Sequence, residues 1–494
     1  MTALTPAALP ALAKTLPVPT YDRDRIVPGI VHIGVGGFHR SHQAMYLDRL
    51  LNDGRTEEYG ICGVGVLPGD QPMKEVLDAQ HGLYTLVVKH PDGTNEARVI
   101  GSIVRYLLAA DDPEAVIELM AAATTRIVSL TVTEGGYSID PVTGDFAPSG
   151  AQVQHDLQPG AVPTTAFGLV TEALGRRRER GTPPFTVMSC DNIQGNGDVA
   201  RRTFSAFARR KDAELGRWVE QEVAFPNSMV DRITPVTSDA DRALVADEFG
   251  IVDGWPVVCE PWTQWVLEDH FSNGRPQLED VGVQLVPDVV PYELMKLRLL
   301  NASHQALCYL GYLSGYRYAH EVCRDPLFVR FLLRYMDEEA TPTLAPVPGV
   351  DLTEYKHALI ERFANPHVRD TLARLCAESS DRIPKWLVPV IRDQLASDGP
   401  VESAALVVAA WARYAEGRDE QGRPIAVVDP LAEQTTAAAR RQDEHPTAFL
   451  DQRDLFGDLV DQPRFVDAYV AALQQLKSHG ARATLEQHMG SLEP

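Results

Sequence analysis

Short apolar runs alternate with amphipathic stretches over the first part of the chain. The runs "GIVHIGVG", "YGICGVGV" and "TRIVSLTVT" have the length of buried strands, and "SHQAMYLDRLL" has helical periodicity between the first two. A fourth run, "FTVMSC" at residues 185–190, resembles one more buried strand. This alternation favours a parallel sheet with crossover helices. Within it, "LYTLVVKHPDGTNEARVIGSIV" predicts a β-hairpin, because Pro91-Asp92-Gly93 separates two alternating segments.

The pattern changes after about residue 287. Long helical periods follow, among them "DPLFVRFLLRYMDEEA", "TEYKHALIERFA" and "VESAALVVAAWARYAEG", with few strand candidates. The 494 residues also exceed what one hydrophobic core usually serves. We therefore expect an α/β domain over residues 1–287 and a mostly α-helical domain over residues 288–494.

One predicted helix carries polar residues on an apolar face. It lies in "PYELMKLRLLNASHQALCYLGYLSGY", and a regular helix places Lys296, Asn301 and His304 within a sector of roughly 140°. Taken singly, each has an ordinary explanation: a surface lysine, a polar notch, or a hydrogen-bonded core histidine. Together they need a reason, since a buried polar group without a partner costs free energy.

Composition and charge narrow the classes of partner. The formal net charge of -22 argues against a nucleic acid or an anionic membrane and leaves small molecules. The six cysteines are scattered, without metal-site spacing. No uninterrupted apolar run reaches membrane-spanning length, and no secretory signal is recognisable, so we expect a cytoplasmic protein.

A glycine turn follows the first strand, in "GVGGFHR". Glycines at the first and third positions between a strand and a helix permit close approach of a pyrophosphate. The third glycine of the dinucleotide-binding fingerprint is absent, since His39 occupies its position, so a turn without a ligand stays an alternative. Zinc on His39 and His42 is disfavoured because no nearby carboxylate or cysteine completes a ligand set. The candidate cofactor contacts are Ile33, Gly34, Val35, Gly36, Gly37, Phe38, His39 and Arg40.

Three motifs in order carry a resemblance to a known family. "IVHIGVGGFHRSHQAMYLD", "FPNSMVDRITP" and "KLRLLNASH" resemble the signatures of the long-chain polyol dehydrogenases, the mannitol 2-dehydrogenase family, and "RIPKWLVPVI" resembles its C-terminal half. The resemblance implies a Rossmann-like NAD-binding domain, a helical substrate domain and zinc-independent oxidation of a secondary alcohol.

The resemblance also assigns catalytic roles. Lys296, partly desolvated and with a depressed pKa, would be the general base, while Asn301 and His304 would donate hydrogen bonds to the substrate oxygen. Glu134 and Glu293 resemble acidic residues that relay the lysine proton to solvent.

Further residues match substrate-binding positions of the family. Asn192 and Asp231 resemble ligands of substrate hydroxyls, although an Asx turn and an ion pair with Arg232 are equally good explanations from sequence. Arg374 and Arg382 match basic positions that contact substrate. Ala377 departs from the family pattern, which expects a polar or imidazole side chain there, and this puts the preferred sugar in doubt.

We therefore predict NAD-dependent interconversion of D-mannitol and D-fructose. NAD is expected over NADP because Asp70 is the only charge in the turn after the second strand and the nearest downstream cation is Lys74. An ordinary turn or helix N-cap role for Asp70 explains its presence equally well. Alternatives are an arabinitol or sorbitol dehydrogenase, a fructuronate or tagaturonate reductase, and a non-catalytic dinucleotide-binding regulator. The oligomeric state stays open, and a monomer is compatible with the sequence.

Overall fold

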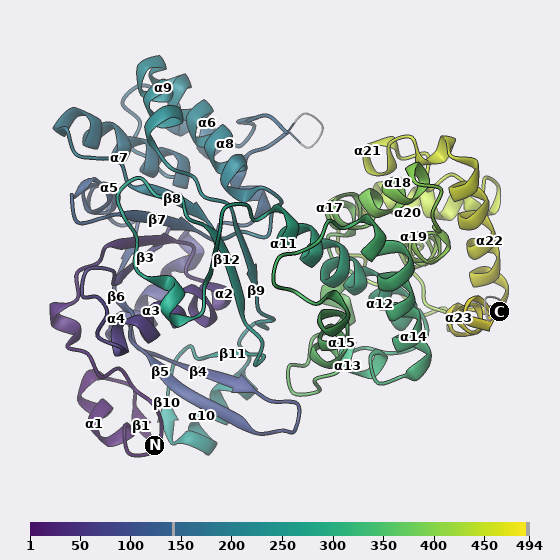
Figure 1. Ribbon diagram of the computed structural model, residues 1–494, viewed down its shortest axis with the longest axis horizontal. Coiled ribbons are helices and arrows are strands. Elements are labelled where there is room, and N and C mark those ends of the chain that lie inside the picture. The colour runs from purple at the N-terminus through teal and green to yellow at the C-terminus, as the bar shows by residue number, and fades with distance from the viewer. Residues whose placement is uncertain (141–143, 491–494) are drawn as a thin grey trace. The chain divides into compact units, whose positions relative to one another are not determined.

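The computed structural model describes residues 1–140 and 144–490, without the side chain of Glu134. These residues form two compact units, Met1–Val290 and Pro291–Pro494. Figure 1 shows the first unit in purple to teal and the second in green to yellow. The first contains sheets and helices and the second is helical, as the change of sequence pattern indicated.

A five-stranded parallel sheet organises the first unit, in the spatial order β6-β3-β2-β7-β8. Its strands are β2 (Ile30–Ile33), β3 (Ile61–Gly65), β6 (Ile103–Leu108), β7 (Ile127–Leu130) and β8 (Thr186–Ser189). Four of them are the apolar runs identified in the sequence. The strand order is that of a dinucleotide-binding fold, which confirms the predicted fold class.

Both faces of this sheet are buried, which explains why its strands are continuously apolar. Ile30 and Ile127 pack into one core and Val31 and Val128 into another, because neighbouring side chains on a strand point to opposite faces. The helices of this unit are α1 (Leu9–Leu12), α2 (Gly37–Ser41), α3 (Gln43–Asn52), α4 (Gln71–Ala79), α5 (Pro113–Ala121), α6 (Ala151–Asp156), α7 (Ala166–Arg180), α8 (Asn196–Lys211), α9 (Ala213–Glu222) and α10 (Asp239–Phe249).

The predicted hairpin is present, but outside the parallel sheet. Strands β4 (Tyr84–Lys89) and β5 (Asn95–Ile100) are antiparallel and form a separate sheet with β11 (Val257–Cys259). A further three-stranded sheet contains β9 (Ser228–Asp231), β12 (Gln264–Glu268) and β13 (Gln284–Val286). A two-stranded sheet contains β1 (Thr2–Ala3) and β10 (Ile251–Val252). The family motif "FPNSMVDRITP" thus includes strand β9.

Two apolar helices form the centre of the second unit. In α12 (Ala302–Leu313) and α19 (Glu402–Ala415) nearly every residue is buried, as expected for core helices. The other helices are α11 (Val290–Met295), α13 (Ala319–Val322), α14 (Pro326–Arg334), α15 (Leu352–Phe363), α16 (Leu372–Leu375), α17 (Ser379–Trp386), α18 (Val388–Ala396), α20 (Ala432–Arg440), α21 (Arg453–Phe456), α22 (Pro463–His479) and α23 (Ala481–Gly490), with π-helices η6 (Lys296–Asn301) and η7 (Tyr335–Ala340).

The sequence-based expectations about membrane-spanning segments and about the cysteines can be compared with the described residues. None of their helices is long and apolar enough to cross a membrane. All six cysteines are buried and unpaired as thiols.

Candidate active site

The glycine turn connects β2 to α2 through a backbone that only glycine adopts easily. Gly34 has φ +96°, and a Cβ atom built there would lie 2.2 Å from the carbonyl oxygen of Thr131 on the neighbouring strand. Gly36 then precedes the first residue of α2. Close packing of the turn against the end of β7 therefore explains the first glycine of the motif.

A cavity of about 800 Å³ opens beside this turn. Ile33, Gly34, Val35, Gly36 and Asp70, all of them candidate cofactor contacts from the sequence, line it. The carboxyl ends of β2, β3 and β7 bound it, together with residues 150–153 and 164–167. This is the edge at which parallel α/β sheets bind ligands, and the volume is in the range of cofactor sites.

The later residues of the motif do not line this cavity. Phe38 is half-buried against the ring of His42, with ring centroids 4.9 Å apart. Arg40 is fully buried, donates to the carbonyl of Trp255 and lies over the ring of Tyr84 at 5.3 Å. The structure thus gives Phe38 and Arg40 packing contacts away from the residues that line the cavity.

The two histidines of the motif are part of the core. The ring of His39 stacks on that of His32, with centroids 3.4 Å apart, and Nε2 of His42 lies 2.8 Å from the carbonyl oxygen of Gln264. Burial lowers the pKa of His39 well below its ordinary value and that of His42 to about 3, so both rings are neutral. Within residues 1–140 and 144–490, no three His, Cys, Asp or Glu side chains are grouped so as to hold a metal ion.

Asp70 has a role in the turn after β3 as well as a place in the cavity wall. Its Oδ2 accepts hydrogen bonds from the backbone N–H groups of Val66 and Leu67, both at 2.9 Å. The nearest downstream cation, Lys74, is paired with Asp78 one helical turn further on. The carboxylate is therefore fixed at the lip of the cavity, and the lysine is held by another partner.

Asp191 is a residue that the sequence analysis did not assign. Its carboxylate accepts from the backbone N–H groups of Val132 and Thr133 and from the hydroxyl of Tyr137. Thr133 has φ +65°, a strained value for threonine, and it lines the cavity. Asp191 thus holds one wall of the cavity in shape. The signal in the sequence that could have identified Asp191 is its position shortly after a buried strand.

The substrate-binding candidates of this unit follow two strands. Asn192 lies after β8, and Asp231 is the buried last residue of β9, where it accepts a hydrogen bond of 3.0 Å from the indole N–H of Trp262. Arg232 donates instead to the carbonyls of Glu260 and Ser41, which favours a role for Asp231 other than a structural ion pair with Arg232. Glu134 begins a 3₁₀ turn, and its side chain lies outside the described residues.

In the second unit, the polar motif lies on a π-helix rather than on a regular α-helix. Lys296 to Asn301 form η6, and His304 follows in the first turn of α12. The predicted 140° sector assumed an α-helix, so it does not hold across η6; the wider turn changes the angular positions. Lys296, Asn301 and His304 are nevertheless 7%, 6% and 7% exposed, and π-turns are frequent at functional sites. Glu293, on the preceding α11, is also buried.

His304 is held as a neutral imidazole. Burial lowers its pKa well below the ordinary value, and the positive charges of Arg374, Arg362, Lys296 and Arg382 act in the same direction. Its ring packs against Phe363 at 4.4 Å. Nε2 of His304 and Oδ1 of Asn301 are buried without a hydrogen-bond partner among the residues that the structure describes. These two atoms, on successive helical turns, are thus available to a polar ligand.

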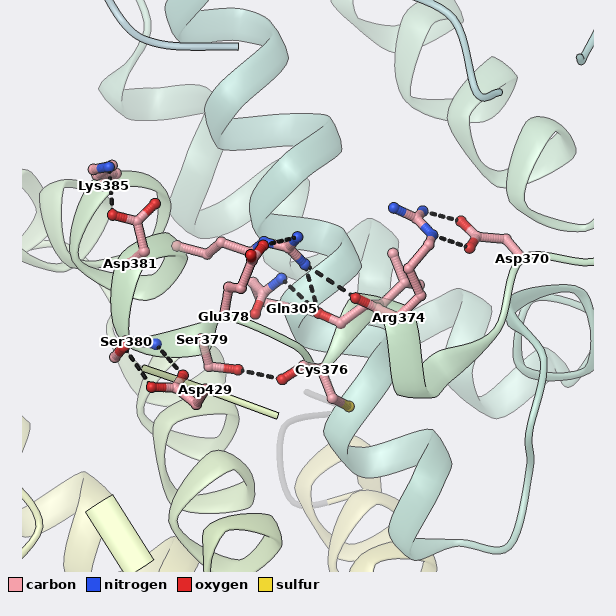
Figure 2. A network of polar contacts seen from close by, with 12 residues as sticks. Gln305, Asp370, Arg374, Cys376, Glu378, Ser379, Ser380, Asp381, Lys385 and Asp429 are labelled. Atoms are coloured by element: carbon pink, nitrogen blue, oxygen red, sulfur yellow. Dashed lines mark hydrogen bonds and ion pairs between the residues drawn. The ribbon is translucent and has the colours of Figure 1, made fainter. Parts of the chain in front are cut away.

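The two candidate arginines are neutralised within their own unit. Arg374 forms a two-pronged ion pair with Asp370, at 2.6 and 2.5 Å (Figure 2). Arg382 donates to Glu378 at 2.9 Å and to the last carbonyls of α16, at 3.2 and 3.3 Å. Each guanidinium group thus has a carboxylate partner four residues away in the sequence.

The segment around Ala377 is fixed by a buried polar chain. Figure 2 shows Gln305, next to His304, reaching this segment, where it donates to the carbonyl of Leu375 at 3.3 Å. The hydroxyl of Tyr309 contacts both Gln305 and Ser379 at 2.5 Å. These bonds tie the backbone on both sides of Ala377 to the helix that carries His304.

Two family models match this chain. The model "Mannitol dehydrogenase Rossmann domain" covers residues 28–280, and "Mannitol dehydrogenase C-terminal domain" covers residues 288–477. The chain belongs to the mannitol dehydrogenase family. A mannitol 2-dehydrogenase of Aspergillus fumigatus is 47% identical over 490 residues, which are 98% of this chain and 97% of that protein.

Solved structures extend this family comparison. A Pseudomonas fluorescens mannitol 2-dehydrogenase, in a ternary complex with NAD and D-mannitol, is 47% identical with a TM-score of 0.92, and the match covers 100% of both chains. A D-sorbitol dehydrogenase in substrate-free form is 36% identical with a TM-score of 0.87, covering 98% of this chain and 100% of that one.

We predict that Gly34→Ala lowers the thermal midpoint and the free energy of unfolding, by at least about 2 kcal/mol. The added methyl would overlap the carbonyl of Thr131 at a φ that alanine disfavours. Calorimetry and urea unfolding measure the effect. Gly69→Ala is the control, because a Cβ there meets nothing within 4 Å. Equal midpoints for the two variants would contradict the packing explanation.

Proposed function

We propose that this chain is an NAD-dependent polyol 2-dehydrogenase that interconverts D-mannitol and D-fructose. The observation that carries the proposal is the burial of Lys296, Asn301 and His304 on consecutive helical turns. Among them, Oδ1 of Asn301 and Nε2 of His304 have no hydrogen-bond partner among the described residues and suit the hydroxyl group of an alcohol. The full-length similarity to an enzyme whose structure contains NAD and D-mannitol supports the same substrate and cofactor.

The cavity at the glycine turn suits a dinucleotide. Ile33, Gly34, Val35 and Gly36 line it and would hold the pyrophosphate, and Asp70 stands at its lip for the ribose hydroxyls. Bound NAD would supply the hydride acceptor. The polar backbone edge and the apolar walls, Val66 and Val132 among them, match the two kinds of surface that such a cofactor presents.

Lys296 is the proposed general base that removes the hydroxyl proton of the substrate. Its side chain is 7% exposed, and desolvation is the effect that allows a lysine to act as a base near neutral pH. Glu293 and Glu134 are the proposed relay that passes this proton to solvent. Glu293 is buried on the helix immediately before Lys296, where a carboxylate suits this task.

Asn301 and His304 are the proposed donors to the substrate oxygen. A neutral imidazole with one N–H and an amide NH₂ both donate without adding a charge. Oxidation places negative charge on that oxygen before the hydride leaves, and hydrogen-bond donors stabilise it. Burial ensures that His304 stays in the neutral form over the ordinary pH range, so its donor is present throughout.

The substrate class follows from the charge of the proposed binding residues. Asn192 and Asp231 combine donors and acceptors, which suits the hydroxyl groups of a polyol. A hexuronate would require basic groups free to bind its carboxylate, whereas Arg374 and Arg382 are paired with Asp370 and Glu378. This favours a neutral polyol over fructuronate or tagaturonate.

Sorbitol is the second candidate substrate, supported by the similarity to a D-sorbitol dehydrogenase. D-Mannitol and D-sorbitol differ in configuration at C2, the carbon that is oxidised. Oxidation of either one at C2 yields D-fructose. Ala377 has no polar group where the family pattern expects one, so other residues of the site must distinguish D-mannitol from D-sorbitol. A panel of mannitol, sorbitol and arabinitol with NAD, followed by absorbance of the reduced cofactor, decides between these substrates.

The proposed cellular location is the cytoplasm.

We expect Lys296→Ala to lower turnover by about 10² to 10⁴, the usual contribution of a general base, while NAD still binds. Steady-state kinetics with D-mannitol and a separate NAD titration measure the two effects. Lys385→Ala is the matched control, because Lys385 is a half-exposed lysine of the same unit paired only with Asp381 among its described contacts (Figure 2). Turnover of Lys296→Ala equal to that of the control would remove Lys296 from the mechanism.

NAD should be preferred over NADP by at least about tenfold in kcat/KM, roughly 1.4 kcal/mol. The carboxylate of Asp70 at the cavity lip would repel a 2′-phosphate, and Lys74 is already paired with Asp78. Matched kinetics with both cofactors measure the ratio, and Asp70→Asn should reduce it. A parent enzyme with equal efficiency for NADP would exclude this assignment.

Chelator treatment should leave activity unchanged, because the proposed base is an amine and not a metal-bound hydroxide. Activity is measured before and after dialysis against EDTA, together with the zinc content of the protein. Stoichiometric zinc whose removal abolishes activity would contradict a zinc-independent mechanism.

A further inference from the structure

A line of hydrogen bonds runs from the interior of the parallel sheet to the glycine turn. His32 on β2 lies directly opposite Ser129 on β7 in the parallel register, and its Nδ1 is 2.8 Å from the hydroxyl of Ser129. Its Nε2 is 2.9 Å from the hydroxyl of Thr131, which in turn donates to the carbonyl of Gly34 at 2.6 Å. We call this chain of hydrogen bonds the His32 relay, after its central residue.

The donors and acceptors fix the direction of these bonds. The Gly34 carbonyl only accepts, so Thr131 donates its single proton there and must accept from Nε2–H of His32. Nδ1 then carries no proton and accepts from Ser129. Burial lowers the pKa of His32 to about 3, so the ring stays neutral and this tautomer is available throughout the ordinary pH range. Each group thus has one consistent role.

The relay ends on the most constrained atom of the turn. The carbonyl oxygen of Gly34 also accepts the N–H of Gly36 at 2.8 Å, and Nε2 of His32 lies 3.3 Å from it. Gly34 has φ +96°, so its backbone needs support to keep one orientation. Fixing this carbonyl fixes the peptide between Gly34 and Val35, both of which line the cavity.

The relay also accounts for the missing third glycine of the fingerprint. His39 occupies that position, and its ring lies flat on His32, with ring centroids 3.4 Å apart and planes inclined by 9°. The third glycine normally permits close packing of helix and strand. Here stacked rings provide the close contact between α2 and β2, and they hold His32 in the plane in which it meets both hydroxyls.

We propose that His32 is a positioning residue for cofactor binding, which acts through Thr131 to hold the Gly34 carbonyl and so sets the glycine turn for the dinucleotide. This rests on the proposed NAD-dependent function. His32 is completely buried and does not line the cavity, so its effect on the cofactor must pass through Thr131 and Gly34.

The test measures NAD binding by titration calorimetry on the full-length protein, together with kcat and KM. Thr131→Val, which removes the hydroxyl at nearly constant shape, should raise the Kd for NAD about fivefold, as expected for one lost hydrogen bond. Thr131→Ser should restore it. His32→Leu should weaken NAD binding to a similar extent, and His32→Gln, which keeps a donor, should recover part of the loss. The KM for D-mannitol at saturating NAD should stay unchanged.

The matched control is Thr85→Val, on β4 of the same unit. Thr85 is a buried strand threonine whose hydroxyl has no hydrogen-bond partner among the described residues, so it reports the effect of the substitution alone. The double variant Thr131→Val/His32→Leu distinguishes direct from relayed action. If His32 acts through Thr131, the double variant binds NAD about as well as Thr131→Val alone.

Each result supports or overturns the inference. Additive losses in the double variant, or a Thr131→Val protein that binds NAD as Thr85→Val does, would overturn it. If His32→Leu does not fold, the comparison of Thr131→Val, Thr131→Ser and Thr85→Val decides. A parent protein that binds no NAD overturns the proposed function and with it the inference, whereas a parent that binds normally leaves the function standing whatever the variants show.

Discussion

The parallel register of β2 between β3 and β7 is the constraint on which the cavity at the glycine turn depends. It brings the carboxyl ends of three strands to one edge, where Gly34, Val66 and Thr131 meet around a single cavity. The close approach of Gly34 to the Thr131 carbonyl is possible only because the strands are aligned without a shift at this point. The positive φ of Gly34, the start of α2 and the hydrogen bonds of His32 follow from the same alignment.

The second unit has a different organising principle, the burial of polar groups in an apolar helix. The π-helix η6 and helix α12 are buried on nearly all sides, so Asn301 at the end of η6 and His304 in α12 cannot be solvated as surface residues would be. The π-turn of Lys296–Asn301 changes the direction of the side chains immediately before α12. Such an arrangement costs stability and is retained where the polar groups serve a ligand. Neutral His304 among several cations is the electrostatic consequence.

Charge compensation separates the possible substrates more clearly than fold does. The fold is shared by a mannitol 2-dehydrogenase and a D-sorbitol dehydrogenase, so the substrate must be argued from the chemical groups of the site and not from the fold. Arg374 and Arg382 would suit an anionic sugar if their charges were available, but Asp370 and Glu378 already hold them. The same ion pairs shape the segment on either side of Ala377. A neutral substrate thus needs no further counter-charge at these positions.

The local sequence pattern was sufficient to predict most strands of the parallel sheet, the hairpin and the helical second unit, because hydrophobic periodicity reflects which faces are buried. It was also sufficient to locate the glycine turn and to single out Lys296, Asn301 and His304 as polar residues within an apolar helical segment, because both features are confined to short segments. Tertiary structure alone decided where these residues point. Arg40 and His39 turn into the core because they pack on Tyr84 of the separate strand β4 and on His32 of β2, across the glycine turn. The π-turn, the hydrogen bond that the strained Thr133 donates to Asp191 and the pairing of Arg374 with Asp370 likewise depend on contacts and backbone geometry that no periodicity encodes.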